Sequence, residues 1–261
     1  MRISSVSYLS RYNRDMLRTS RKLASGKRIN SAADNATGLA IANKLNSRVI
    51  GTTVGVSNAQ TSQNMLNVAD GAIGSVTDSL QRIRELSIQA SNGLYSSSDR
   101  SAIQAEIDQL KEQIGGITAQ TKFNEMNVLD GSMGSSHVAS NADGGGMNID
   151  MPKFSLEALG IADYDVTSGN FDVGAIDKAL EKVSSSRSYL GASYNGLDHT
   201  INYNNYAAYN LTAAQSRIED TNYAQSSSEF KKQQILGTYS IMMQRKLINN
   251  ADGHVRLLMG N

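Results

Sequence analysis

Apolar residues recur every seven positions along residues 176–218. The repeat consists of Ile176, Val183, Leu190, Leu197, Asn204, Leu211 and Ile218. A repeat sustained over this length is typical of a long helix with a narrow apolar stripe. Such a helix would be about 65 Å long at a rise of about 1.5 Å per residue. It therefore needs partner helices of similar length to cover its stripe.

Two further segments can supply those partners. Residues 37–90 have a heptad line at Ala69, Val76, Ile83 and Ala90, and residues 103–117 alternate spacings of four and three at Ile103, Ile107, Leu110, Ile114 and Ile117. Asn92-Gly93 should end the first helix and Ser98-Asp99 should cap the second, and so short a connection makes the two antiparallel. We therefore expect a mainly α fold, an elongated antiparallel coiled-coil or helical bundle. Its expected core includes Val76, Ile83, Ile107, Ile114, Val183, Leu190, Leu197 and Leu211.

The middle of the chain, residues 122–172, has no helical period. It is rich in turn signals, including Asp130-Gly131 and the cluster Asp143-Gly144-Gly145-Gly146. Short segments on either side of the glycine cluster predict a small β-hairpin at about residues 132–152. The long helix at residues 37–90 contains five glycines, at positions 38, 51, 55, 71 and 74, which at this density indicate close backbone packing.

The two ends of the chain each predict one amphipathic helix. Residues 1–29 carry a weak apolar stripe that breaks at Gly26, and residues 219–258 carry a second stripe that includes Phe230, Ile235 and Leu247. A single amphipathic helix can bury its apolar face only against the other end or against another molecule. We therefore expect self-assembly through the ends. An Arg-rich and Ser-rich start also fits a mitochondrial transit peptide, although the pattern here continues into the body of the chain.

Composition narrows the possible classes of protein. The net charge is only +1, and the chain has no cysteine, one proline and no run of apolar residues long enough to span a membrane. Residues 1–30 are an exception, with eight basic side chains against Asp15 alone and a net charge of +7. Nucleic-acid binding through this segment would show a steep dependence on salt. We expect instead that these arginines serve subunit contacts, with no nucleic acid partner and no membrane insertion.

No catalytic or metal-binding pattern is present. The three histidines, at positions 137, 199 and 254, lie far apart, and the glycine cluster is not followed by the Lys-Ser of a phosphate loop. Tyr203, Tyr206 and Tyr209 are better explained by packing than by base stacking. We expect no cofactor, no metal and no enzymatic activity. A secreted enzyme would need an inserted domain, for which there is no room.

Several sequence blocks at both ends of the chain resemble bacterial flagellin. They are Ser25-Gly-Lys-Arg-Ile-Asn30, Ala33-Asp-Asn-Ala-Thr-Gly-Leu-Ala-Ile-Ala42, Leu80-Gln-Arg-Ile-Arg-Glu-Leu-Ser-Ile-Gln-Ala90, Leu197-Asp-His-Thr-Ile-Asn202 and Asn210-Leu-Thr-Ala-Ala-Gln-Ser-Arg-Ile-Glu-Asp220. No single block is decisive, but their order and combination are specific. Asn35 stands where the family has a second aspartate, and the segment before Ser25 is shorter than usual.

The resemblance implies a core-only subunit of the flagellar filament. Residues 1–35 and 220–261 would pair as the inner-tube coiled coil, and residues 36–219 would form the outer tube without an inserted surface domain. Inner-tube contacts between subunits would use Val6, Leu9, Met16, Ile235, Met242, Leu247, Leu257 and Leu258. The family is exported through the flagellar type III channel, so an extracellular subunit without a cleaved signal peptide is expected. Implied partners are further copies of the chain, an export chaperone, the cap protein and hook-junction proteins.

The resemblance also leaves two further possibilities. In flagellins that activate the Toll-like flagellin receptor, the contact centre consists of an Arg, a Leu and a Glu that match Arg82, Leu86 and Glu106. Leu86 lies off the heptad line, so it could be exposed in a monomer or buried between subunits. The alternative function is a hook–filament junction protein, whose ends are similar and whose sequence often begins Met-Arg-Ile-Ser as here.

Overall fold

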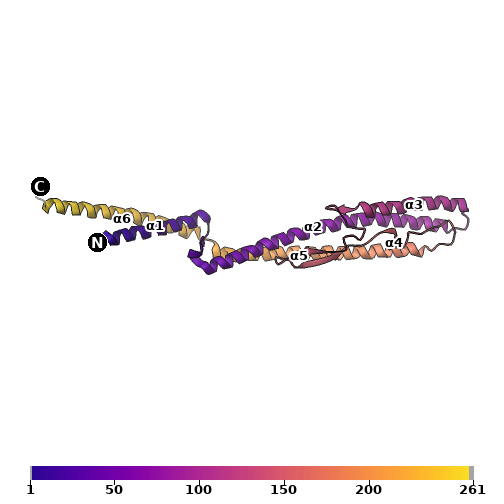
Figure 1. The fold of residues 1–261 in the computed structure, drawn as a ribbon, viewed down its shortest axis with the longest axis horizontal. Coiled ribbons are helices and arrows are strands. Elements are labelled where there is room, and N and C mark those ends of the chain that lie inside the picture. The colour runs from indigo at the N-terminus through magenta and orange to yellow at the C-terminus, as the bar shows by residue number, and fades with distance from the viewer. Residues whose placement is uncertain (1, 259–261) are drawn as a thin grey trace. The chain divides into compact units, whose positions relative to one another are not determined.

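The computed structural model describes residues 2–258, with side chains from Ser10 to Asn250. Helices dominate and the strands are short (Figure 1), which confirms the expected mainly α class. The elements are α1 (Arg2–Ser25), α2 (Ala32–Ala90), α3 (Ser97–Gln120), β1 (Lys122–Phe123), β2 (Met126–Asn127), β3 (Ser135–Ala139), β4 (Gly146–Asp150), α4 (Leu156–Leu159), α5 (Gly174–Glu219) and α6 (Tyr223–Leu258). The strands form two separate antiparallel pairs, β1 with β2 and β3 with β4.

The chain divides into two compact units. One, the terminal unit, consists of the residues up to Ser47 and those from Tyr209 on, and the other, the central unit, runs from Arg48 to Ala208. These boundaries lie inside the two long helices, whereas the division into inner-tube and outer-tube segments at residues 35 and 220 stays a prediction. Each unit is considered separately below.

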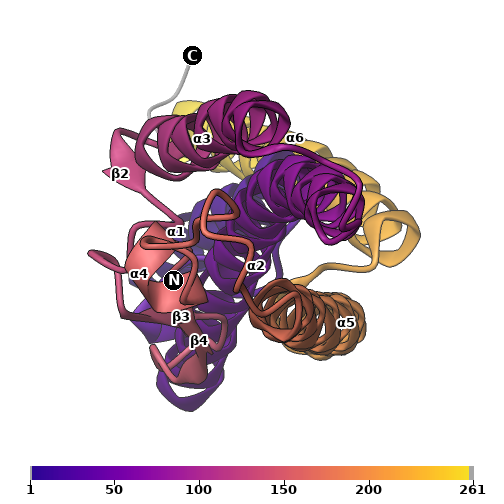
Figure 2. The same ribbon diagram turned by 90° about the vertical axis from the view of Figure 1, so that its right-hand side faces the viewer.

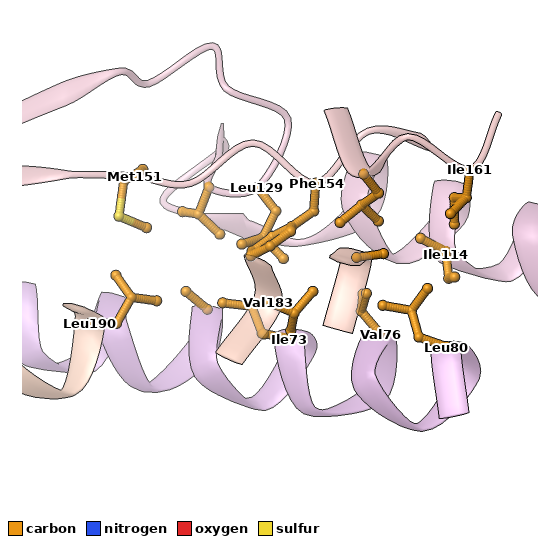
Figure 3. Close-up of a cluster of buried hydrophobic side chains, with 14 of the residues drawn as sticks. Ile73, Val76, Leu80, Ile114, Leu129, Met151, Phe154, Ile161, Val183 and Leu190 are labelled. Atoms are coloured by element: carbon orange, nitrogen blue, oxygen red, sulfur yellow. The ribbon is translucent and has the colours of Figure 1, made fainter. Parts of the chain in front are cut away.

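The core of the central unit lies among three helices and the irregular segment that follows α3. α2 lies between α3 and α5, and the segment with α4, β3 and β4 covers the remaining side (Figure 2). The side chain of Phe154 is fully buried among residues from α2, α3 and α5 (Figure 3). The irregular segment also buries Leu129, Ile149 and Ile161. It therefore forms a fourth side of the core, although its sequence has no hydrophobic repeat from which this could be predicted.

Seven of the eight core residues expected from the heptad lines belong to this buried cluster. Val76, Ile83, Ile107, Ile114, Val183, Leu190 and Leu197 are each at most 2% exposed. Leu211 is only partly buried. It continues the seven-residue repeat of α5 but lies beyond Ala208, outside the central unit.

The ends of α3 and α4 show how local polar groups fix this segment. Ser96, not Ser98, is the N-cap of α3, because its side chain accepts from the amide of Asp99 while the Asp99 carboxylate accepts from the amide of Ser96. α4 was not expected from the sequence. Ser155 caps its start and Gly160 ends it in the left-handed conformation, with φ of 78°.

The β3–β4 hairpin lies where the sequence predicted it, and its tip lies against α2. A Cβ atom on Gly55 would overlap the Ser140 carbonyl, and one on Gly51 would lie 2.8 Å from the Ala142 oxygen. At these two positions glycine does permit close backbone packing. Gly71 and Gly74, by contrast, have open space around them.

Two amides hold the tip of the hairpin in this position. Asn58 of α2 donates to the Ala139 carbonyl at 2.9 Å. Asn204 of α5, which is buried, donates to the Ser140 carbonyl at 2.7 Å. The hairpin therefore bonds to both helices, and Asn204 occupies a heptad position because a polar group is needed there.

Candidate assembly interface

α1 and α6 pack against each other in the terminal unit (Figure 1). The phenol ring of Tyr12 lies so close to Gly237 that any Cβ there would overlap it. At the other end of the pair, the Thr221 amide donates to the Gly26 carbonyl at 2.9 Å. These contacts make the pair antiparallel. Sequence reasoning missed Gly237, although a glycine inside an apolar helical pattern is the signal that could have found it.

α6 leaves a long apolar surface uncovered within the described residues. Eight of its large exposed apolar side chains, here called the α6 stripe, lie between residues 235 and 248 and are between 44% and 69% exposed: Ile235, Leu236, Tyr239, Ile241, Met242, Met243, Leu247 and Ile248. Part of this surface forms a shallow hollow lined by Ile235, Tyr239 and Met242. α6 has 36 residues and α1 only 24, so one helix cannot cover the other along its length.

The residues expected to form inner-tube contacts fall into two groups. Ile235, Met242 and Leu247 are 69%, 62% and 65% exposed and belong to the α6 stripe. Met16 is half-buried in α1 and accepts a hydrogen bond from the Tyr12 hydroxyl at 3.4 Å. The other expected residues lie outside the described side chains: Val6, Leu9, Leu257 and Leu258.

The segment that follows α1 is joined to the end of α5 by a hydrogen bond and an ion pair. The Arg28 amide donates to the Glu219 carbonyl at 2.6 Å, and the Lys27 ammonium lies 2.7 Å from the Glu219 carboxylate. The hydrogen bond from Lys27, with a second from Gln215, holds the pKa of Glu219 below its usual range. The Glu219 side chain is largely buried. Removing Lys27 or Gln215 would therefore leave the Glu219 carboxylate with fewer partners and with reduced access to water.

Asp34 organises the turn between α1 and α2. Its carboxylate accepts from the amides of Asn30 and Ser31 at 3.0 and 3.1 Å, and it pairs with Arg18 at 2.7 Å. The backbone bond from Asn30 is the main cause of the lowered pKa of Asp34, and the bond from Arg18 adds to it. The adjacent Asn35 is not helical, with φ of −166°, and its side chain accepts from the Gly38 amide. Asn35 therefore caps the long helical run that follows.

Arg82 and Glu106 lie together on the surface of the central unit. Two guanidinium nitrogens of Arg82 contact one Glu106 carboxylate oxygen at 2.9 and 2.7 Å, and a third contacts Glu85 at 3.2 Å. These carboxylates raise the pKa of Arg82, Glu106 contributing most. Leu86 differs from both, because it is 2% exposed and packs in the core of its own chain. It is therefore neither exposed on the subunit nor left available for a neighbouring one.

Three tyrosines near the end of α5 do not pack as expected. Tyr203, Tyr206 and Tyr209 are 72%, 74% and 75% exposed, so the packing interpretation is wrong for the folded chain. Their spacing of three places them near one another on the helix surface, on the side of α5 opposite the buried heptad line.

No group of His, Cys, Asp or Glu side chains in the described part of the chain could hold a metal ion. His137 bonds to Asn148 and Gly144 within the hairpin, which raises its pKa, and it has no acid or nucleophile among its hydrogen-bond partners. Among the described residues, no helix is both long enough and apolar enough to cross a membrane.

Together these features define a class: a helical structural protein with a closed core in one unit and an open apolar surface in the other. The family model for the bacterial flagellin N-terminal helical region matches residues 1–133. The family model for the bacterial flagellin C-terminal helical region matches residues 173–255. The chain belongs to the bacterial flagellin family, which confirms the resemblance expected from the sequence. The family is one of structural proteins.

The chain matches its relatives over most of their length. The chain is 36% identical over 249 residues to the flagellar filament 33 kDa core protein of Treponema phagedenis, covering 87% of each. It is 38% identical over 228 residues to a flagellin of Halalkalibacterium halodurans, covering 85% of this chain and 84% of that one. The crystal structure of Bacillus cereus flagellin is similar over 57% of this chain and 88% of that chain, with 27% identity and a TM-score of 0.51.

A flagellar hook-associated protein from Vibrio parahaemolyticus, described as putative in its structure report, shares the fold. It covers 72% of this chain with a TM-score of 0.59, but the identity is only 14%. That likeness concerns the fold alone.

Proposed function

We propose that this chain is a structural subunit that polymerises into the filament of a bacterial flagellum. The relatives named as flagellins and as a filament core protein support this function. The observation that carries the proposal is the α6 stripe, because it lies in the family's C-terminal helical region and its side chains are at least 44% exposed.

Burial of the stripe against a neighbour favours association. Fully burying one Leu, Ile or Met side chain stabilises by about 1.5–3 kcal/mol. The stripe contains seven such side chains and Tyr239, so their burial works against the cost of ordering two surfaces. The stripe of one copy would pack on a different surface of the next copy. Contacts between unlike surfaces repeat without closing and so generate filaments.

Further partners follow from this function. An extracellular flagellar subunit has to stay unassembled inside the cell, and the α6 stripe is a suitable surface for an export chaperone. The cap protein and the hook-junction proteins would contact the same terminal helices at the two ends of the filament. We propose export through the flagellar type III channel.

Seeded polymerisation followed by electron microscopy tests the main proposal. The purified chain should extend short filament seeds, whereas the double variant Ile235→Ser with Met242→Ser should fail to extend them. Lys231→Ser, an exposed polar position of the same helix, is the matched control and should polymerise normally. Filaments formed equally well by the double variant would contradict the role of the stripe.

The same assay separates the alternative function. A hook–filament junction protein should bind to an end and stop growth, whereas a filament subunit should extend the seed in proportion to the protein added. A chain that caps seeds without extending them would favour the junction function.

A second proposed function is recognition by the Toll-like flagellin receptor through Arg82 and Glu106. Both side chains are partly exposed, at 50% and 44%, and the ion pair between them fixes their positions. Leu86 would support this surface from below.

Arg82→Ala and Glu106→Ala should each reduce receptor signalling by the monomeric protein. The control is Arg187→Ala, which removes an equally exposed pair with Asp70 on the same unit. Unchanged signalling in both test variants would contradict the proposal.

A further inference from the structure

We propose that Asn92 is a site of spontaneous deamidation, in which the Gly93 peptide nitrogen displaces ammonia from the Asn92 side chain. The tripeptide Asn-Gly-Leu occurs twice in the chain, at residues 92–94 and at residues 195–197. Glycine offers no Cβ to hinder this attack. Because the two tripeptides are identical, any difference in their reactivity has to come mainly from backbone structure.

The first copy lies in the exposed connection between α2 and α3. Asn92, Gly93 and Leu94 are all exposed, and Leu94 is 91% exposed. No atom lies within 4 Å of the place a Cβ of Gly93 would occupy. Within the described part of the chain, the Gly93 amide donates to no backbone or side-chain oxygen. The attacking nitrogen is therefore not held by another bond.

The carbon that is attacked is held over the Gly93 peptide. The Leu94 amide donates to the Asn92 side-chain oxygen at 3.1 Å, which folds the side-chain amide back over the intervening peptide. Negative charge develops on this oxygen when the nitrogen attacks. An N–H group already directed at the oxygen stabilises that charge, as in an oxyanion hole.

A second bond acts on the attacking group. The Tyr95 amide donates to the main-chain oxygen of Asn92 at 3.2 Å. This oxygen and the Gly93 nitrogen belong to the same peptide group, and resonance shares charge between them. The bond therefore stabilises the deprotonated peptide nitrogen, which is the nucleophile.

The reaction balances with hydroxide and water as the only co-reactants. Hydroxide removes the Gly93 N–H proton and becomes water, and the nitrogen bonds to Cγ of Asn92. The bond from Cγ to the side-chain nitrogen then breaks, and this nitrogen takes a proton from water and leaves as ammonia, which regenerates hydroxide. Water then opens the five-membered succinimide at either carbonyl. The products are an aspartyl residue in place of the asparagine, or the isoaspartyl isomer with one extra methylene in the backbone. Both add a negative charge to the turn.

The second copy provides an internal control. Asn195 is exposed as well, but residues 195–197 lie in the middle of α5, and Leu197 is fully buried. The Gly196 amide belongs to the helical hydrogen-bond ladder, so it cannot reach the Asn195 side chain until the helix opens.

Peptide mass spectrometry of the folded full-length chain, aged at mildly alkaline pH, tests the proposal. Conversion adds about 1 Da, and an isoaspartyl-specific methyltransferase identifies the isomerised product. Asn92 should convert at least about tenfold faster than Asn195, equivalent to about 1.4 kcal/mol in barrier. In denaturant, where both tripeptides are unfolded, the two rates should converge. Equal rates in the folded chain would overturn the proposal.

The contribution of the turn itself is tested by two further comparisons. Asn92 should react at least as fast in the folded chain as in denaturant, and a faster reaction after unfolding would overturn the argument from the two amide bonds. Gly93→Ala should slow Asn92 at least about tenfold while leaving the helical circular dichroism unchanged, because its Cβ meets open space. Undiminished conversion in this variant would contradict attack by that nitrogen.

Discussion

The central and terminal units use similar apolar residues in different ways. In the central unit, Phe154, Ile107 and Leu197 are 0% exposed. In the terminal unit, Ile235, Met242 and Leu247 are each more than 60% exposed. The difference comes from what surrounds each helix, because three helices and the irregular segment enclose the central core, whereas α6 packs against α1 and, among the described residues, leaves the α6 stripe exposed.

This difference explains how one chain can be both a stable protein and an assembly subunit. A helix covered on one side buries only part of its apolar surface, and its remaining stability has to come from other molecules. The central unit does not need such help. We therefore expect substitutions of buried residues to act on folding, and substitutions in the α6 stripe to act on assembly.

The largest effect is expected for Phe154→Ala. Removing this fully buried ring leaves a cavity and should lower the free energy of unfolding of the central unit by about 3–5 kcal/mol. Chemical denaturation followed by circular dichroism measures the change. Tyr206→Ala, at a position 74% exposed, is the control and should change stability by less than about 0.5 kcal/mol. A similar loss in both variants would show that the central unit is not closed around Phe154.

Gly55→Ala and Gly71→Ala should have opposite signs. The methyl group at position 55 would overlap the Ser140 carbonyl and should destabilise by about 1–3 kcal/mol. At position 71 the methyl group meets open space, and alanine should stabilise the helix by about 0.5–1 kcal/mol. Denaturation of both variants measures the two changes. Equal stabilisation at both positions would mean that the hairpin tip does not lie against α2.

The heptad lines allowed much of the central unit to be predicted. Val76, Ile107 and Val183 are buried because a seven-residue period keeps one face of each helix toward its partners. The period says nothing about residues 122–172, where Phe154 and Ile161 reach the core from turns and irregular backbone. The period also predicted wrongly that Leu211 is a core residue, because a sequence repeat does not show where the helices that pack against it end.

The candidate assembly surface was less predictable. The stripe of α6 could be read from the sequence, but its exposure depends on which face α1 covers. That pairing rests on the fit of Tyr12 against Gly237, residues separated by most of the chain. Leu86 was ambiguous for a similar reason, because a position beside a heptad line is buried only where a third element packs on it.

Acid should weaken the terminal unit through Asp34 and Glu219. Their pKa values are lower when folded than unfolded, so their contribution is complete above the unfolded values of about 4 and is lost as pH falls through the folded values. Because Lys27 is half exposed, we expect its pair with Glu219 to contribute about 0.2–1 kcal/mol.

Amide hydrogen exchange of α1 and α6 across this pH range measures the loss. The double variant Asp34→Asn with Glu219→Gln should show weaker protection at neutral pH and a flatter dependence on pH. Asp99→Asn is the control, because that carboxylate also has a lowered pKa but caps α3 in the central unit. An unchanged pH dependence in the double variant would show that these carboxylates do not hold the terminal unit together.

The smallest effect on folding is expected for Leu247→Ala, and it separates the two units most directly. Leu247 is 65% exposed, so the monomer should lose less than about 0.5 kcal/mol, whereas Leu197→Ala, at a fully buried position, should lose about 2–5 kcal/mol. At a temperature where both variants remain folded, Leu247→Ala should reduce the rate of seeded filament growth more than Leu197→Ala does. The same leucine-to-alanine change would then act on assembly in one unit and on folding in the other. If Leu247→Ala instead destabilised the monomer as much as Leu197→Ala, the α6 stripe would already be covered within the subunit, and another surface would have to drive polymerisation.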